Sequence, residues 1–386
     1  MIFVALKMLM GDRAKYIGII IGLTFASLLI TQQASVFVGL MTRTFAAVTD
    51  LGQADIWVMD PKVQFVDDVK PLSDTKLFLV RGVAGVQWAV PLYKGLLKAR
   101  LENGNFQTCN VLGIDDATLV GGPPKMVEGR LEDLHRAEAV IIDVNGARGK
   151  LARPPSVEGG ERTPLRIGDT LELNDHRAVV VGLCEVTRTF QSQPTVYTTY
   201  SRATQFAPKE RRLLSFILVK PKPDQDPAAL CTRIQAQTGL LAITRPDFQW
   251  TTVRYYMKYT GIPINFGIAV LLGFLVGTVI AGQTFYNFTL DNLKQFGALK
   301  AMGASNFTLL RMILVQALTA GSIGYGLGVG LASLFGRAVR GSELAFRMMP
   351  QILWISAGAV AFICALSAVL SIRKVMKLEP AIVFKS

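Results

Sequence analysis

The most informative absence in this sequence is that of charge from four long stretches. Only 18% of its 386 residues are Asp, Glu, Lys or Arg, and none of these occurs in residues 16–42, 260–290, 312–336 or 348–372. Each stretch exceeds the roughly 20 residues that a helix needs to cross about 30 Å of hydrocarbon. We therefore predict four transmembrane helices.

Residues that carry chemistry are also scarce. The two histidines, His135 and His176, each sit beside charged residues, as solvated loop side chains do. The four cysteines show no CxxC spacing, which argues against a zinc site. The chain has no GxSxG, HExxH or GxxxxGK followed by Ser or Thr. We expect no catalytic residue, metal or bound cofactor, and any energy from ATP must come from a partner.

The cysteines leave the disulfide state open. Cys364 falls in the fourth apolar stretch, so an odd number, Cys109, Cys184 and Cys231, lies outside the predicted helices. Two of these could pair, although we expect buried thiols on strands.

The four apolar stretches contain no acid or base that could relay a proton or an ion. Such intramembrane groups are typical of pumps and ion pathways. The polar residues Gln32, Gln33, Asn265 and Gln316 are poor substitutes. The sequence therefore argues against a proton-coupled carrier and an ion channel.

The distribution of positive charge predicts the orientation. A cleaved secretory signal is the alternative reading of the first stretch, but its 27 uncharged residues exceed a signal core of about 7 to 15. Four spans place both termini and the loop near residue 290 on one side. These pieces hold ten basic residues and three acids, namely Lys7, Arg13, Lys15, Lys294, Lys300, Arg311, Arg373, Lys374, Lys377, Lys385, Asp12, Asp291 and Glu379. Basic flanks stay cytoplasmic, which predicts a multi-pass protein of the bacterial inner membrane with both termini inside. The loop 337–349 disagrees with this orientation, because it carries Arg337, Arg340 and Arg347 against Glu343 on the predicted outer side.

The formal net charge of +13 does not indicate nucleic-acid binding. Much of this charge comes from the predicted cytoplasmic pieces. The large region between the first two spans contains no stripe of basic residues of the kind that binds nucleic acid.

We predict an α+β membrane protein with a large mixed α/β extracytoplasmic domain between its first and second transmembrane helices. The expected segments are an amphipathic N-terminal helix (1–15), helix 1 (16–41), a two-lobed outer domain (42–259), helix 2 (260–288), a cytoplasmic helix and loop (289–308), helix 3 (309–336), a short outer loop (337–349), helix 4 (350–372) and a cytoplasmic tail (373–386).

The outer domain reads as mixed strands and helices. Runs rich in Val, Ile and aromatic residues predict strands at 54–60, 86–101, 106–115, 139–144, 170–174, 177–186 and 215–220. Ser73 is expected to cap a helix over 74–81, and Asp226 one that runs to about Gln237 and ends at Gly239. Residues 120–195 are expected to form an all-β insertion, and 153–164 an exposed loop.

Small residues recur at four-residue spacing in the apolar stretches. Such spacing lets helices approach closely in lipid. Ordinary packing within the chain explains it equally well, but four spans are few to enclose a substrate path, so we also expect a dimer. The predicted packing residues are Gly18, Gly22, Gly273, Gly277, Gly324, Gly328, Ala357 and Ala361.

A charged, glycine-containing segment, LDNLKQFGALKAMGASN (290–306), separates the second and third apolar stretches. Its lysines keep it out of lipid, Leu293 and Phe296 offer apolar side chains on nearby turns, and two glycines allow it to meet the helices at an angle. A solvated loop helix is the plain alternative. The candidate site residues are Leu290, Asp291, Leu293, Lys294, Phe296, Gly297, Leu299, Lys300, Ala301 and Gly303.

This segment resembles the cytoplasmic segment of the MacB/FtsX-like family of ABC transporter permeases, which has the pattern G-x-L-x-A-x-G-A. Residues 165–182, LRIGDTLELNDHRAVVVG, are similar to a strand pair of that family's outer domain, and Glu379, Pro380 and Ala381 to its terminal EPA. DIWVMDP (55–61) and QWAVPLYKG (87–95) look closest to the DevC-like exporter branch. The resemblance covers the whole chain in order. Gln295 and Asn292 depart from the Glu and basic residue common there, which puts a salt-bridged dock in doubt.

The resemblance implies a permease subunit whose segment is a coupling helix, seated in a groove of a separate ABC ATPase that holds ATP and Mg. A dimer, a periplasmic adaptor and an outer-membrane channel are further implied partners. Two alternatives remain, an FtsX-like permease that controls a periplasmic hydrolase and a membrane-anchored sensor or binding protein without an ATPase. The residues select no cargo.

Overall fold

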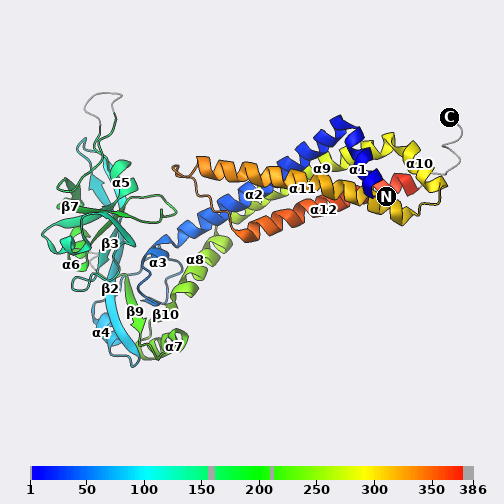
Figure 1. The fold of residues 1–386 in the computed structure, drawn as a ribbon. Helices are drawn as coiled ribbons and strands as arrows, with labels where there is room; N and C mark the ends of the chain where they lie inside the picture. The colour runs from blue at the N-terminus through cyan, green and yellow to red at the C-terminus, as the bar shows by residue number, and fades with distance from the viewer. Residues whose placement is uncertain (1, 155–160, 209–212, 377–386) are drawn as a thin grey trace. The chain divides into compact units, whose positions relative to one another are not determined.

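The computed structural model describes residues 2–154, 161–208 and 213–376 (Figure 1). The chain divides into two compact units, one made of Met1–Leu40 with Thr260–Ser386 and the other of Met41–Tyr259. We call them the helical unit and the sheet unit.

The helical unit is built from apolar helices, as the uncharged stretches predict. Its helices are α1 (Ile2–Gly11), α2 (Arg13–Thr44), α9 (Ile262–Asp291), α10 (Leu293–Ala301), α11 (Asn306–Ala338) and α12 (Pro350–Met376). Helices α2, α9, α11 and α12 are long and apolar enough to cross a membrane. The prediction of four such helices with a large mixed domain between the first two is confirmed. The terminal EPA lies outside the described residues.

Glycines bring three of these helices together within one chain. A Cβ built on Gly277 of α9 would lie 2.3 Å from the Cβ of Ala26 in α2. One built on Gly324 of α11 would lie 2.7 Å from the Cβ of Leu23, also in α2. The predicted residues Gly22, Gly273 and Gly328 make similarly close approaches, whereas Gly18 has a neighbour only at 3.9 Å. The small residues therefore let α9 and α11 pack directly on α2.

The alanine stripe of α12 does not lie on its buried face. Ala361 is exposed and Ala357 is half-buried, whereas Ser356, Val360 and Cys364 are buried. The buried row is offset from the alanine row by one residue, about 100° around a helix. Ala361 therefore does not serve packing inside this chain.

The sheet unit contains ten strands within its described residues. They are β1 (Ile56–Met59), β2 (Val86–Arg100), β3 (Phe106–Ile114), β4 (Lys125–Glu128), β5 (Ala139–Asp143), β6 (Thr170–Leu173), β7 (His176–Glu185), β8 (Thr195–Thr199), β9 (Phe216–Pro221) and β10 (Leu241–Thr244). Their order is β10-β1-β9-β2-β3-β8-β5-β7-β4, with β6 paired to β2 and β7. The residue pattern predicts strands at seven of these positions and does not reveal β4, β8 and β10.

The long strand β2 changes its partner halfway along (Figure 1). Its first half pairs with β9 up to Leu92 opposite Phe216. From Tyr93 onward it pairs with β3, where Tyr93 lies opposite Gly113. One strand therefore belongs to two sections of sheet, and a gap can open beside the point of change.

Short helices complete the sheet unit. They are α3 (Ala46–Asp50), α4 (Thr75–Arg81), α5 (Val144–Arg148), α6 (Tyr200–Phe206), α7 (Pro227–Thr238), α8 (Arg245–Tyr259) and the 3-10 helix η1 (Leu131–His135). The expectation of an all-β insertion over 120–195 is wrong, because η1 and α5 lie inside it. Helix α5 forms where the Asp143 carboxylate accepts a hydrogen bond from the Gly146 N–H at 2.7 Å.

The cap residues decide where two of the predicted helices begin and end. Asp226 caps α7 by accepting from the Ala229 N–H at 3.0 Å, and Gly239 ends it with φ of 69°. The N-cap of α4 is Asp74 rather than the expected Ser73. Of the expected loop 153–164, Arg153 and Thr163 form an isolated bridge, and 155–160 lie outside the described residues.

Candidate functional site

The segment between α9 and α11 forms a separate short helix, α10. Helix α9 continues through Leu290 and Asp291, so these two candidate residues belong to its last turn. Asn292 breaks the helix with φ of −98° and ψ of 17°, and its Nδ2 donates to the Phe288 carbonyl oxygen at 2.8 Å. The chain therefore changes direction at Asn292 without leaving the end of α9 unsatisfied.

Residues 303–305 end helix α10 and begin helix α11. Gly303 has φ of 94°, and its N–H donates to the Lys300 carbonyl oxygen at 3.0 Å. The Ala304 N–H donates to the Leu299 carbonyl oxygen at 3.0 Å, which completes a Schellman motif. Ser305 then caps α11 by accepting from the Thr308 N–H at 3.2 Å. The residues Gly-Ala-Ser thus fix the angle between α10 and α11.

One face of α10 is buried in its own chain. The side chain of Phe296 has 0% exposure and Gly297 is also buried. Leu293 and Leu299 are half-buried and pack against the same apolar cluster, which includes Phe285, Phe288 and Leu309. The expectation that Phe296 offers an apolar contact to a partner is therefore not met, since this side chain anchors α10 instead.

The opposite face is exposed and carries both charge and apolar surface. Lys294 and Ala301 are exposed there, while Lys300 is half-buried. Two large apolar side chains that sequence reasoning overlooked are more exposed, Met302 at 77% and Phe307 at 74%. Met302 lies at the end of α10 and Phe307 at the start of α11, on either side of Gly303. Their positions next to this predicted helix end could have marked them as exposed. Phe307 belongs to the first turn of α11 rather than to α10. We call Met302, Phe307 and Lys294 the exposed residues of the α10 region.

An ionic contact ties this region to the start of α2. Lys15 forms ion pairs with Asp291 and, at 2.9 Å, with Asp12. The hydrogen bond from Lys15 lowers the pKa of Asp12. Helices α1 and α10 accordingly lie at the same end of the helical unit (Figure 1). In α11, the Gln316 amide donates to the Ala5 carbonyl oxygen of α1 at 2.7 Å, which holds the N-terminal helix to the same end.

The described residues offer little for covalent or metal chemistry. No group of three His, Cys, Asp or Glu side chains among them is placed to hold a metal ion. All four cysteines are free and buried. The expectation of buried thiols on strands is confirmed for Cys109 in β3 and Cys184 in β7, but it is wrong for Cys231, which lies in helix α7. Burial raises the pKa of Cys109 and of Cys231 to about 12, so both thiols are protonated and unreactive at neutral pH.

Comparisons with protein families cover both units. Residues 16–237 match the MacB-like periplasmic core domain, and residues 252–380 match the FtsX-like permease C-terminal region. An uncharacterized ABC transporter permease of Mycobacterium bovis is 26% identical over 237 residues, which are 60% of this chain and 62% of that protein. This match thus spans less than two thirds of that relative's length. Another from Mycobacterium tuberculosis is 25% identical over 320 residues, 81% of this chain and 79% of that one.

Two solved structures match about half of this chain. The periplasmic region of MacB from Actinobacillus actinomycetemcomitans matches with 17% identity and a TM-score of 0.37, over 55% of this chain and 96% of that chain. The extracellular domain of the noncanonic ABC-type transporter YknZ from Gram-positive bacteria matches with 12% identity and a TM-score of 0.34, over 50% and 98%. Both scores are low, so the assignment rests on the two family matches. This multi-pass membrane protein, with its MacB-like periplasmic domain, belongs to the MacB/FtsX-like family of ABC transporter permeases.

Proposed function

We propose that this chain is the permease subunit of an ABC exporter of the bacterial inner membrane, and that α10 is its coupling helix. The observation that carries the proposal is the construction of α10. It is anchored on one face by Phe296 and stopped by Gly303. Lys294 on α10, Met302 at its C-terminal end and Phe307 in the first turn of α11 are exposed. Exposed large apolar side chains of this kind suit a groove on a partner protein.

The orientation proposed for this function follows from the four spans. Both termini and α10 lie in the cytoplasm, where a separate ABC ATPase binds ATP and Mg. Because Phe296 is buried and the Schellman motif fixes the turn, α10 cannot slide independently of α9 and α11. Movement of the ATPase against the exposed residues of the α10 region is thus passed to the transmembrane helices, and through them to the periplasmic domain.

The proposed assembly contains two permease copies and two ATPase chains. In a DevC-like exporter, the periplasmic domain would also meet an adaptor that leads to an outer-membrane channel. The sequence resemblance at 55–61 and 87–95 supports this branch.

Co-purification tests the proposal. The full chain, gently solubilised from its native host, is expected to bring down a P-loop ATPase identified by mass spectrometry. The double variant Met302→Asp with Phe307→Asp should lose that ATPase, because two carboxylates replace the apolar pair. Phe78→Asp is the matched control, since Phe78 is 65% exposed on α4 of the sheet unit. Absence of any ATPase from the wild type, or equal recovery with the double variant, would contradict the proposal, as would full transport by Gly297→Pro.

A further inference from the structure

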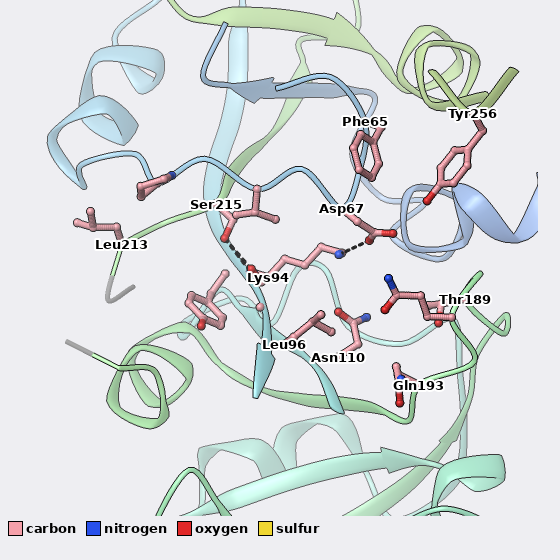
Figure 2. A pocket seen from close by; sticks show the side chains of 15 residues that line it. Phe65, Asp67, Lys94, Leu96, Asn110, Thr189, Gln193, Leu213, Ser215 and Tyr256 are labelled. Atoms are coloured by element: carbon pink, nitrogen blue, oxygen red, sulfur yellow. Dashed lines mark hydrogen bonds and ion pairs between the residues drawn. The ribbon is translucent and has the colours of Figure 1, made fainter. Parts of the chain in front are cut away.

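The sheet unit contains a cavity of about 660 Å³ beside the point where β2 changes partner (Figure 2). Residues 93–96 of β2 form its base, and Asn110 of β3 lies next to them. Connecting segments around Phe65 and Gln193, together with Tyr256 of α8, complete the lining. This volume falls within the roughly 300–1,000 Å³ of small-molecule sites.

An ion pair crosses the cavity, and its Asp67 side chain is 33% exposed. The side chain of Lys94 is 6% exposed, and its Nζ lies 2.5 Å from Asp67 Oδ1. Ser215 fixes the backbone beneath it, because its hydroxyl accepts from the Lys94 N–H at 2.9 Å and donates to the Lys94 carbonyl oxygen at 3.1 Å. Since each charge is balanced by the other, the cavity presents donors and acceptors without a net charge from this pair.

Asn110 supplies an acceptor that has no protein partner. The residue is 4% exposed, and its Oδ1 makes no hydrogen bond within the described part of the chain. Figure 2 shows its amide pointing into the space below the Lys94–Asp67 pair. Buried polar atoms are nearly always hydrogen-bonded, and an orphaned one is destabilising. A ligand with a hydrogen-bond donor would satisfy it.

Aromatic rings close the side of the cavity near Asp67 (Figure 2). The ring of Phe65 is stacked on Tyr255 with centroids 4.2 Å apart, and it contacts Tyr256 edge-on at 5.6 Å. Tyr256 is supported in turn by Phe190 at 5.1 Å. This packing holds the rings in place, so they form a rigid apolar surface next to the polar groups.

We propose that this cavity binds a neutral polyhydroxylated ring, that is, a carbohydrate. A hydroxyl can donate to Asn110 Oδ1 and to the Asp67 carboxylate and can accept from Lys94, whereas a purely donating or purely accepting ligand matches only some of these groups. For an anion, attraction to Lys94 is offset by repulsion from Asp67, and a cation meets the reverse, so neither ion gains from the pair. The C–H face of a sugar ring packs on the aromatic side. The proposal does not depend on coupling to an ATPase.

Saturation-transfer NMR on the full-length permease tests this binding without nucleotide or ATPase, so its outcome is separate from that of the transport proposal. The protein is placed in lipid nanodiscs, because maltoside and glucoside detergents carry the competing group. Maltose, citrate and spermidine are compared at equal concentration. Transfer to maltose alone is expected, whereas no transfer to maltose, or a stronger signal for either ion, would overturn the proposal.

Asn110→Leu distinguishes a binding role from a structural one. It removes the unpaired oxygen at similar volume, so we expect maltose affinity to fall about tenfold while the melting temperature stays equal or rises. Gln205→Leu, at an exposed position of α6 away from the cavity, is the matched control and should bind maltose normally. Unchanged maltose binding by Asn110→Leu would overturn the proposal. A lower melting temperature for this variant would do the same, because it would assign Asn110 a structural role.

Discussion

The helical unit and the sheet unit are stabilised by different kinds of contact. In the helical unit, Thr31 Oγ1, Ser35 Oγ and Ser367 Oγ are buried without a hydrogen-bond partner among the described residues. In the sheet unit, the buried Asp143 carboxylate accepts from the N–H groups of Gly146 and Thr195, both at 2.7 Å. Atoms without a partner in the described ranges also occur in the sheet unit, at Trp57 Nε1 and Asn110 Oδ1, so they do not separate the two units. The difference is that glycines such as Gly277 bring helices of the first unit into backbone contact, whereas Asp143 joins separate segments of the second by hydrogen bonds. We therefore expect the stability of the helical unit to fall when side-chain volume is added between its helices. The stability of the sheet unit should fall when a hydrogen-bond acceptor is removed.

The largest effect should come from volume added between α9 and α2. Gly277→Val places side-chain atoms where the Cβ of Ala26 already lies, and Ala26 has no flexible end that can move aside. We expect a loss of about 3 kcal/mol in the free energy of unfolding, measured as a lower melting temperature of the purified permease. Gly326→Val is the control, because a Cβ built on Gly326 has no atom within 4 Å. Equal melting temperatures would remove the distinction between the units.

The next effect concerns a lost acceptor in the sheet unit. Asp143→Ala leaves the buried N–H groups of Gly146 and Thr195 unpaired, so we expect a loss of about 2 kcal/mol at neutral pH. Asp224→Ala, at an exposed position, should change stability little. Chemical unfolding followed by fluorescence measures both. A neutral Asp143→Ala variant would show that this unit does not depend on directed hydrogen bonds.

The same carboxylate predicts a pH dependence. Burial raises the pKa of Asp143, although hydrogen bonds from Thr195 and Gly146 oppose this. The folded chain therefore holds this proton more tightly than the unfolded chain, whose pKa is about 3.9. The stability that this group contributes is full below about pH 4 and is lost as the pH rises through the raised folded pKa. The stability difference between wild type and Asp143→Ala should thus shrink with rising pH, and an increase would contradict the sign of the shift.

A smaller effect is expected at the turn after α10. Gly303→Ala forces a residue with a side chain into φ of 94°, which should be unfavourable by about 1 kcal/mol and loosen the angle between α10 and α11. ATPase stimulation by the permease should fall with it. Gly358→Ala, in α12 with open space around it, is the control. Equal ATPase stimulation by the two variants would show that coupling does not depend on the turn at Gly303.

The smallest effect should come from the ion pair between Lys15 and Asp291. The Asp291 side chain is 57% exposed, so solvent screens the pair and Asp291→Asn should be unfavourable by only about 0.5 kcal/mol. Its effect on melting temperature should vanish at high salt. A large, salt-independent loss would show that polar contacts matter more in the helical unit than the comparison implies.

The sequence predicts the helices better than the sheet, for a physical reason. A transmembrane helix can be recognised from a single continuous segment without charged residues, such as residues 16–42. Strands β8 and β10 have only five and four residues, and all five of β8 are buried, so neither shows alternation. The role of Phe296 was missed because spacing places residues on one face of a helix but does not say which face is buried.

The cavity could not be predicted at all. Its residues come from distant segments, from Phe65 to Tyr256, that only the pairing of β2 with both β9 and β3 brings together. Asn110 is one polar residue in an otherwise ordinary strand, and its missing partner becomes visible only when its surroundings are known.

Labelling from one side of the membrane tests the central claim most directly. Met302→Cys and Phe78→Cys are made separately in the otherwise native chain, whose four cysteines are buried, and a membrane-impermeant maleimide is added to right-side-out and inside-out vesicles. We predict that Met302→Cys reacts only in inside-out vesicles and is protected when the ATPase is present, and that Phe78→Cys reacts only in right-side-out vesicles. Reaction of both on the same side would contradict a coupling helix in the cytoplasm.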